Sequence, residues 1–212
     1  TVADAAHARG ALVLVDAAQS VGAIRTDIDA LGIDALTVAT QKALLALYGF
    51  GFLYVRRAVA ETMIPCAVAR YGMDLGADAG ETARGDGYLP YAAGARRFDL
   101  GNYNYLGAEA VEAALELITR TGIDRIEAHV RGLAARLASG LLALGLPVAG
   151  GAPGLHLAHI VAVGRSGGGH HDSADDPAMN SLHEHLGAHD VRLSIRRGVL
   201  RMSVGVYNDA AD

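Results

Sequence analysis

The clearest structural signal in the chain is the apolar run Ala11-Leu-Val-Leu-Val15, which is followed directly by Asp16. An uninterrupted apolar run of this length is typical of a strand that is buried on both faces of a sheet. The ten residues before it have the apolar spacing of a helix that stops at Gly10. A helix that leads into a buried strand indicates an α/β fold.

The segments after Asp16 continue this pattern. Two further β-like runs follow, Ala35-Leu-Thr-Val-Ala39 and Gly51-Phe-Leu-Tyr-Val55, with a short turn or helix expected over 28–31. Residues 1–60 therefore predict the middle of a doubly wound sheet. Residues 70–104 are rich in Gly, Ala, Asp and Tyr and show little periodicity, which favours a functional loop region.

The second half of the chain predicts a small α+β domain. Apolar residues at helical spacing indicate helices over 108–120, 124–144 and about 179–187. A strand is expected over 159–163. The chain closes with a predicted hairpin, whose arms at 191–195 and 199–206 flank a turn at Arg197-Gly198.

Composition and charge narrow the classes of partner. The 212 residues are 51% hydrophobic and 19% charged, enough for one large domain or two small ones. A net charge of -5 and the absence of a basic run argue against nucleic acid or a membrane surface, because both need a clustered positive field. No apolar stretch approaches the ~20 residues that span a bilayer, and the residues from Thr1 to Gly10 do not have the charged-then-apolar pattern of a secretion signal. We therefore expect a small-molecule partner and a cytoplasmic location.

A single lysine, Lys42, stands among 17 arginines. A GC-rich genome that encodes Arg by default is one explanation, and the lysine count does not separate it from a chemical one. The chemical explanation is that a guanidinium cannot form an imine with a carbonyl group, whereas a lysine amine of lowered pKa can.

Three polar residues follow neighbouring predicted strands: Asp16, Gln19 and Lys42. Asp16 alone would more simply be a helix cap or a loop aspartate. The carboxyl ends of strands in an open α/β sheet converge on one crevice, however, so the three side chains are expected to meet there. Pyridoxal phosphate (PLP) chemistry needs a lysine to hold the aldehyde as an imine and a carboxylate to keep the pyridine nitrogen protonated. Asp16 and Lys42 supply both groups.

Four ordered motifs resemble the aminotransferase class V family, which includes cysteine desulfurases, selenocysteine lyases and isopenicillin N epimerase. The motifs are Val13-Leu-Val-Asp-Ala-Ala-Gln-Ser-Val-Gly22, Thr40-Gln-Lys-Ala-Leu-Leu-Ala-Leu-Tyr-Gly-Phe-Gly-Phe-Leu-Tyr-Val55, Arg97-Phe-Asp-Leu-Gly-Asn102, and Leu200-Arg-Met-Ser203 with Tyr207-Asn208. The resemblance implies the second half of a PLP-transferase type I large domain, a mostly parallel sheet with helices, plus a small α+β C-terminal domain. It divides the chain into part of the cofactor-binding domain over 1–104, a linking helix over 105–122 and the small domain over 123–212.

The resemblance also implies roles for individual residues. Lys42 becomes the Schiff-base lysine, Asp16 the partner of the pyridine nitrogen and Gln19 a donor to the phenolic oxygen of the ring. Arg201 is expected to hold the substrate carboxylate.

Further residues are expected to contact the cofactor phosphate. The family often has His before the lysine, with Ser or Thr nearby, and this chain has Thr40 and Gln41 there as hydrogen-bond donors. Asn102 stands where the family commonly has a Thr or Ser that reaches the phosphate of the neighbouring subunit. The implied assembly is therefore a homodimer, and no metal site is expected, since His170 and His171 in a Gly-rich loop lack the fixed spacing of metal ligands.

The implied function is a PLP-dependent enzyme that acts on an amino acid or related amine, as a transaminase, epimerase or lyase. Persulfide-forming desulfurases carry a reactive cysteine just before the Arg-x-Ser signature, whereas the segment 195–201 is short and lacks one, and the only cysteine is Cys66. The family's phosphate cradle and ring-stacking residue have no counterpart in the chain, which reads as truncated at both ends. The alternative is therefore a non-catalytic fragment or pseudoenzyme module.

Overall fold

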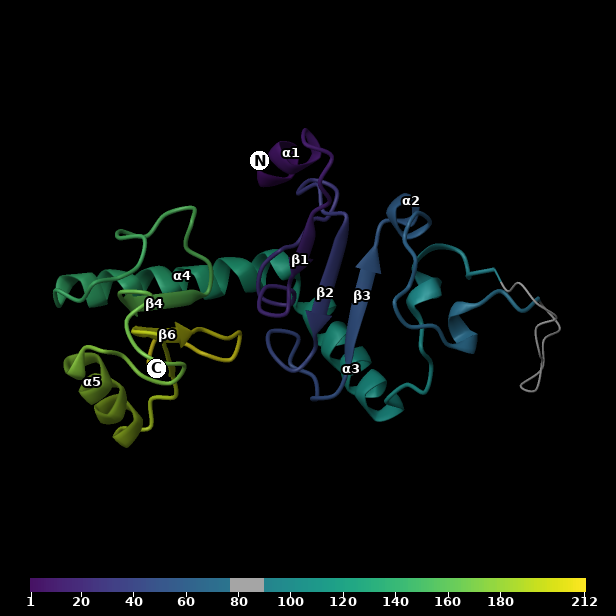
Figure 1. Cartoon of the computed structure of the whole chain (residues 1–212). Coiled ribbons are helices and arrows are strands. Elements are labelled where there is room, and N and C mark those ends of the chain that lie inside the picture. Colours follow the sequence, from purple (N-terminus) through teal and green to yellow (C-terminus); the bar gives the residue numbers. More distant parts are fainter. Residues whose placement is uncertain (77–89) are drawn as a thin grey trace. The chain divides into compact units, whose positions relative to one another are not determined.

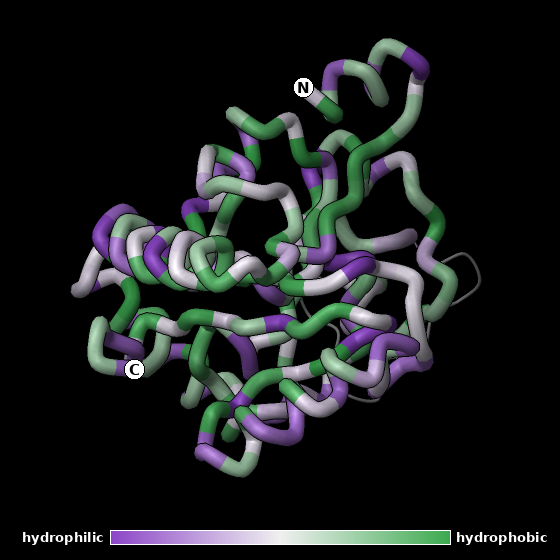
Figure 2. The backbone as a smooth tube through the Cα atoms, turned by 90° about the vertical axis from the view of Figure 1, so that its left-hand side faces the viewer, coloured by the Kyte–Doolittle hydropathy of each residue, from purple (hydrophilic) through white to green (hydrophobic). Residues whose placement is uncertain are grey.

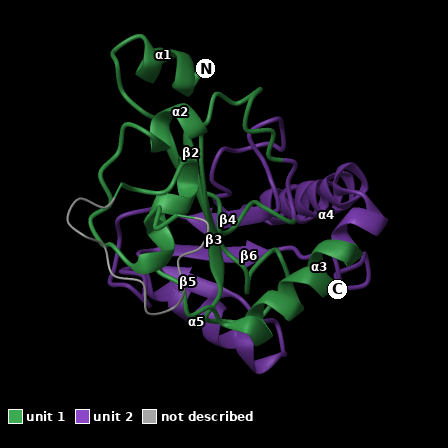
Figure 3. Cartoon of the chain, turned by 90° about the vertical axis from the view of Figure 1, so that its right-hand side faces the viewer, with its two compact units in different colours: residues 1–22, 26–117 green, residues 23–25, 118–212 purple. Residues whose placement is uncertain are grey.

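The computed structural model describes residues 1–76 and 90–212. The chain contains both helices and strands (Figure 1). The chain divides into two compact units (Figure 3): Thr1–Gly22 with Thr26–Leu117, and Ala23–Arg25 with Ile118–Asp212. Helix α3, Tyr105–Thr121, contains the division point. The predicted boundaries at 104 and 122 stay predictions.

The first unit is built on a three-stranded sheet of order β1-β2-β3. Its strands are β1 (Leu14–Asp16), parallel to β2 (Ala35–Ala39), and β3 (Gly51–Val55), antiparallel to β2. The predicted strands at 35–39 and 51–55 are confirmed, as is a turn over 28–31. Short helices flank the sheet: α1 (Val2–His7) and α2 (Arg57–Ala60).

The expectation that the first strand is buried on both faces is wrong for this chain. Figure 2 shows the run into β1 as a continuous hydrophobic segment, yet Leu12 is 58% and Leu14 66% exposed. The physical reason is the strand order, because β1 lies at the edge of the sheet and has β2 on one side only. Central β2 instead supplies the buried residues Leu36 and Val38.

The predicted loop region over 70–104 contains two 3-10 helices among its described residues, η1 (Arg70–Gly72) and η2 (Gly94–Phe98). Arg97, which belongs to η2, is buried and donates to the carbonyls of Ala92 (3.3 Å) and Met63 (3.1 Å). Residues 77–89 of this predicted region, including Tyr88, lie outside the described residues.

The second unit is an antiparallel sheet of order β4-β6-β5 against two helices. The elements are α4 (Ile123–Ala143), β4 (Ile160–Gly164), α5 (Pro177–Ala188), β5 (Ser194–Arg196) and β6 (Val199–Ser203). Every predicted element of this half is present, with shorter hairpin arms. No helix in either described range is long and apolar enough to cross a bilayer.

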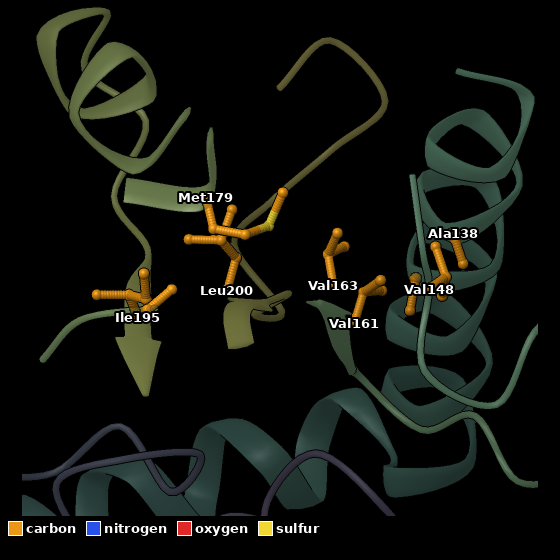
Figure 4. Packing of buried hydrophobic residues seen from close by; sticks show 9 residues of the cluster. Ala138, Val148, Val161, Val163, Met179, Ile195 and Leu200 are labelled. Carbon is orange, nitrogen blue, oxygen red and sulfur yellow. The ribbon is translucent and has the colours of Figure 1, made fainter. Parts of the chain in front are cut away.

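The core of the second unit forms where one face of α4 meets the sheet. Buried residues recur every four positions along α4, at Ile126, Val130, Ala134 and Ala138, which places them on one helical stripe. The last two join the cluster in Figure 4, whose other members come from the strands, from α5 and from the segments that precede β4 and α5: Val148, Val161, Val163, Ala174, Met179, Ile195 and Leu200.

Candidate active site

Asp16 and Lys42 both lie at the end of the first unit's sheet that is formed by the carboxyl ends of β1 and β2. The two strands run parallel, and Asp16 at the end of β1 is in register with Thr37 of β2. The chain leaves β2 at Ala39 and reaches Lys42 three residues later. Both side chains are exposed. The predicted convergence of strand ends therefore holds for the segments that carry Asp16 and Lys42.

A second contact brings the segment after β1 against the segment that carries the lysine. Gly22, with φ +101°, lies so close to the backbone of residues 43 and 44 that an added Cβ would be 2.4 Å from the Ala43 oxygen. Only glycine fits such an approach. Gln19, exposed and three residues before Gly22, therefore lies on a segment that is packed against the Lys42 segment.

Asp16 is oriented by its own turn. Its Oδ1 accepts a hydrogen bond from the Ala18 amide (3.0 Å), and the Ala17 amide donates to the Thr37 carbonyl (2.8 Å), which extends the pairing of the strands. The carboxylate is thus fixed at the strand end while its side chain stays exposed. An exposed amine and an exposed, oriented carboxylate at one sheet edge fit what PLP requires of its lysine and of the partner of its ring nitrogen.

The phosphate-contact residues predicted from the sequence lie on two segments of the same unit. Gln41 is half-buried beside Lys42, and Thr40 is fully buried. Asn102 is exposed and has φ 53°, directly after Gly101 with φ 71°. Asp99 shapes this turn, because its Oδ1 accepts from the Gly101 amide (2.8 Å) and its Oδ2 from the Tyr103 hydroxyl. The hydrogen bond to Asp99, more than burial, raises the pKa of Tyr103.

Asn104 connects the Asn102 turn to the end of the lysine segment. Its Oδ1 accepts from the Gly107 amide (3.0 Å) at the start of α3, and its Nδ2 lies 3.4 Å from the Gly49 carbonyl oxygen. Sequence analysis missed Asn104, although an Asn just before a helical pattern is a capping signal. It also gave no role to Gly22, for which no local pattern signals a close approach.

Arg201 lies in the second unit, on the central strand β6, where it is paired with Ala162 of β4 and Ser194 of β5. It is half-buried, whereas its neighbour Leu200 is fully buried, so the guanidinium lies on the face opposite the core. The nearby His159 is buried, and its Nδ1 has no hydrogen-bond partner among the described residues. Burial, and secondarily the charge of Arg201, lower the pKa of His159. A neutral imidazole adds no second positive charge beside Arg201.

The histidines of the Gly-rich stretch take part in a local charge cluster. His171 Nδ1 lies 2.7 Å from Asp172 Oδ1, and Arg196 donates to the same carboxylate oxygen. Across residues 1–76 and 90–212, no group of three or more His, Cys, Asp or Glu side chains is arranged to hold a metal ion.

The sequence model of the aminotransferase class-V family matches residues 1–212, the whole chain. The chain belongs to this family. Membership indicates pyridoxal phosphate as the cofactor. The aminotransferase YcbU of Bacillus subtilis (strain 168) is 36% identical over 134 residues, which cover 63% of this chain and 34% of that protein. The probable cysteine desulfurase of Vibrio cholerae serotype O1 is 28% identical over 100% of this chain and 50% of its own length.

Solved structures of class-V proteins share the fold. The apo cysteine desulfurase from Thermococcus onnurineus NA1 superposes with a TM-score of 0.75 at 24% identity, over 99% of this chain and 51% of that one. A variant of C-DES with glycine covalently linked to its PLP cofactor superposes with a TM-score of 0.75 at 21% identity. The match covers 95% of this chain and 49% of that one. The predicted fold class is therefore confirmed. The chain spans about a third to a half of the length of these relatives.

Proposed function

We propose that the protein containing this chain is a PLP-dependent enzyme that acts on an amino acid or related amine, and that Lys42 binds the cofactor covalently. The observation that carries the proposal is the convergence of the Asp16, Gln19 and Lys42 segments, through the parallel β1–β2 pair and the Gly22 approach. Family membership supports the same chemistry.

Each proposed site residue has a role that fits the chemistry of its side chain. Lys42 Nζ would attach the cofactor aldehyde and move the proton at the substrate Cα. Asp16 would keep the ring nitrogen protonated, and Gln19 would donate to the phenolic oxygen. When bound, the cofactor supplies the electron sink for negative charge at Cα. Arg201 would orient the substrate, because its planar fork matches a carboxylate.

Gln41 and Asn102 complete the proposal, as donors to the phosphate. Asn102 would act on the phosphate of a second subunit, so the proposed assembly is a homodimer. Its exposed side chain, on a turn fixed by Asp99, is consistent with contact across an interface. The proposal keeps the cytoplasmic location that we expect from the sequence.

The reaction type is narrowed by the turn before Arg201. Several relatives are named cysteine desulfurases, some of them as probable. In this chain β5 and β6 are joined by the two-residue turn Arg197-Gly198, which has no room for a cysteine-bearing loop. The only cysteine, Cys66, is exposed on a different unit from Arg201. We therefore favour transaminase, epimerase or lyase chemistry without a protein persulfide in this chain.

The decisive experiment replaces Lys42 in the full-length protein. Purified wild type with PLP should show the visible absorption of covalently bound cofactor, and borohydride should fix the label on the peptide that contains Lys42. Lys42→Ala and Lys42→Arg should both lose that label. The arginine variant is the matched control for charge, because a guanidinium stays cationic but does not form the bond.

Mass spectrometry of the digested protein locates the label. A label that persists elsewhere in Lys42→Ala would refute the assignment of Lys42. Wild-type protein that takes up no PLP would favour the non-catalytic alternative instead.

A further inference from the structure

The segment 40–50, here called the Lys42 loop, is closed at its base by a single residue, Thr40. The Thr40 hydroxyl lies 3.0 Å from the Phe50 carbonyl oxygen and 3.2 Å from that of Leu47. The Thr40 amide also donates to Phe50 (3.4 Å), and the Thr40 carbonyl accepts from the Ala46 amide (3.0 Å). Thr40 therefore holds the end of the loop with its side chain and both backbone groups.

The burial of Thr40 makes these bonds consequential. The residue is 0% exposed, so its hydroxyl has no access to water and depends on these two carbonyls for its hydrogen bonds. Leu44, 1% exposed, anchors the middle of the loop, and Gly22 packs against its backbone. The Lys42 side chain itself remains exposed. The loop is thus held at Thr40 and Leu44, while the Lys42 side chain between them is exposed.

The same geometry bears on the phosphate contact predicted for Thr40. A hydroxyl has one proton to donate, and here that proton faces the Leu47 and Phe50 carbonyls. The Thr40 amide is directed at Phe50 as well. Neither Thr40 donor is directed at a ligand. Gln41, the next residue, is half-buried, and its side-chain amide remains the candidate donor to the phosphate.

We propose that Thr40 is a positioning residue, which fixes the Lys42 loop so that the lysine amine meets the cofactor aldehyde at the sheet edge, and that it does not bind the phosphate. This inference rests on the proposed role of Lys42. It predicts that removing the hydroxyl loosens residues 42–50 and weakens cofactor attachment, whether or not the cofactor carries its phosphate.

The test uses Thr40→Val, which keeps the branched shape and removes the hydroxyl, and Thr40→Ser, which restores it. Thr62→Val is the matched control, since the Thr62 hydroxyl donates to Val59 (2.8 Å) outside the loop and is exposed. In full-length protein without cofactor, hydrogen exchange of the Leu45 and Ala46 amides should be at least about tenfold faster in Thr40→Val. Thr40→Ser and Thr62→Val should match wild type there.

A second readout separates positioning from phosphate binding. Apparent affinities of PLP and of pyridoxal, which lacks the phosphate, are compared by absorbance. Positioning predicts that Thr40→Val weakens both by the same factor. A loss confined to PLP, or unchanged exchange in the loop, would overturn the proposal. If Thr40→Val does not fold, Thr40→Ser decides alone, since loop exchange faster than wild type would refute it.

The two readouts also keep this inference apart from the assignment of Lys42. Exchange in cofactor-free protein does not depend on which lysine binds PLP. Suppose that the label persists in Lys42→Ala while hydrogen exchange in the Thr40→Val loop is faster. Thr40 would then still hold the loop, and only the assignment of the covalent site to Lys42 would be wrong.

Discussion

Asp34 shows how one carboxylate can connect three segments. Its Oδ2 accepts from the Val13 amide (2.8 Å) and lies 2.8 Å from His7 Nε2, so it joins the approach to β1, α1 and the start of β2. The Val13 hydrogen bond first, and then His7, lower the pKa of Asp34. A carboxyl whose pKa is lowered by folding stabilises the fold above its unfolded pKa near 4, and that contribution disappears as the pH falls through the folded pKa.

Asp34→Asn should therefore lower the free energy of unfolding at pH 7 by on the order of 1 kcal/mol, and the gap to wild type should narrow below pH 4. Urea unfolding of both proteins between pH 2.5 and 7 measures this difference in the free energy of unfolding. Asp124→Asn, which removes an exposed carboxylate, is the control. A gap that stays constant across this range would contradict the linkage.

Arg201 tests the substrate side of the site. In the full-length enzyme, Arg201→Lys should reduce kcat/KM for an α-amino acid by about 1.5–3 kcal/mol, because a charge-assisted fork is replaced by a single ammonium. The absorption of bound PLP should stay unchanged. Arg192→Lys, an exposed arginine before β5, is the matched control. If Arg201→Lys and Arg192→Lys had the same kcat/KM, Arg201 would have a structural role and would not bind the substrate.

At the level of elements, the β5–β6 turn depends on glycine. Arg197 and Gly198 both have positive φ, 46° and 85°, as a two-residue hairpin turn requires. A Cβ on Gly198 would lie 2.3 Å from the Gly168 carbonyl oxygen. Gly198→Ala should lower stability by about 1–3 kcal/mol.

Gly167→Ala is the matched control for this turn, because Gly167 has φ +98° but open space around its Cβ position. It therefore carries the conformational cost without the clash. Calorimetric Tm values compare the two, and an equal loss would show that the contact with Gly168 contributes nothing.

The elements that the sequence predicts well are those whose signal is local. The strands 35–39 and 51–55 follow from their short β-like runs, and the hairpin turn follows from Arg197-Gly198. The start of α3 was placed at 108 instead of 105, because Tyr105 and Leu106 are exposed and do not extend the apolar stripe. The exposure of β1 depends on its place in the sheet order, which no local pattern encodes.

For the molecule as a whole, the sequence indicates which residues to propose for the site but not how the fold supports them. Asp16 and Lys42 were predictable because parallel strands end at one edge of a sheet. The direction of the Thr40 hydroxyl was not, since a threonine two residues before the proposed Schiff-base lysine can donate equally well to a ligand or to its own loop. The close approach of Gly22 likewise joins segments that are about twenty residues apart, which only the tertiary fold reveals.

The edge position of β1 has a consequence for handling these 212 residues as a separate polypeptide. No described strand pairs with the outer side of β1, and Leu12 and Leu14 are largely exposed there. Unprotected apolar edges recruit strands from other molecules. We expect such a polypeptide to self-associate with rising concentration, and Leu14→Lys to suppress the light scattering, whereas Leu155→Lys, at a 94% exposed loop position, should not. The strand that carries the proposed cofactor residue Asp16 is thus also the strand at which we expect the isolated polypeptide to begin to aggregate.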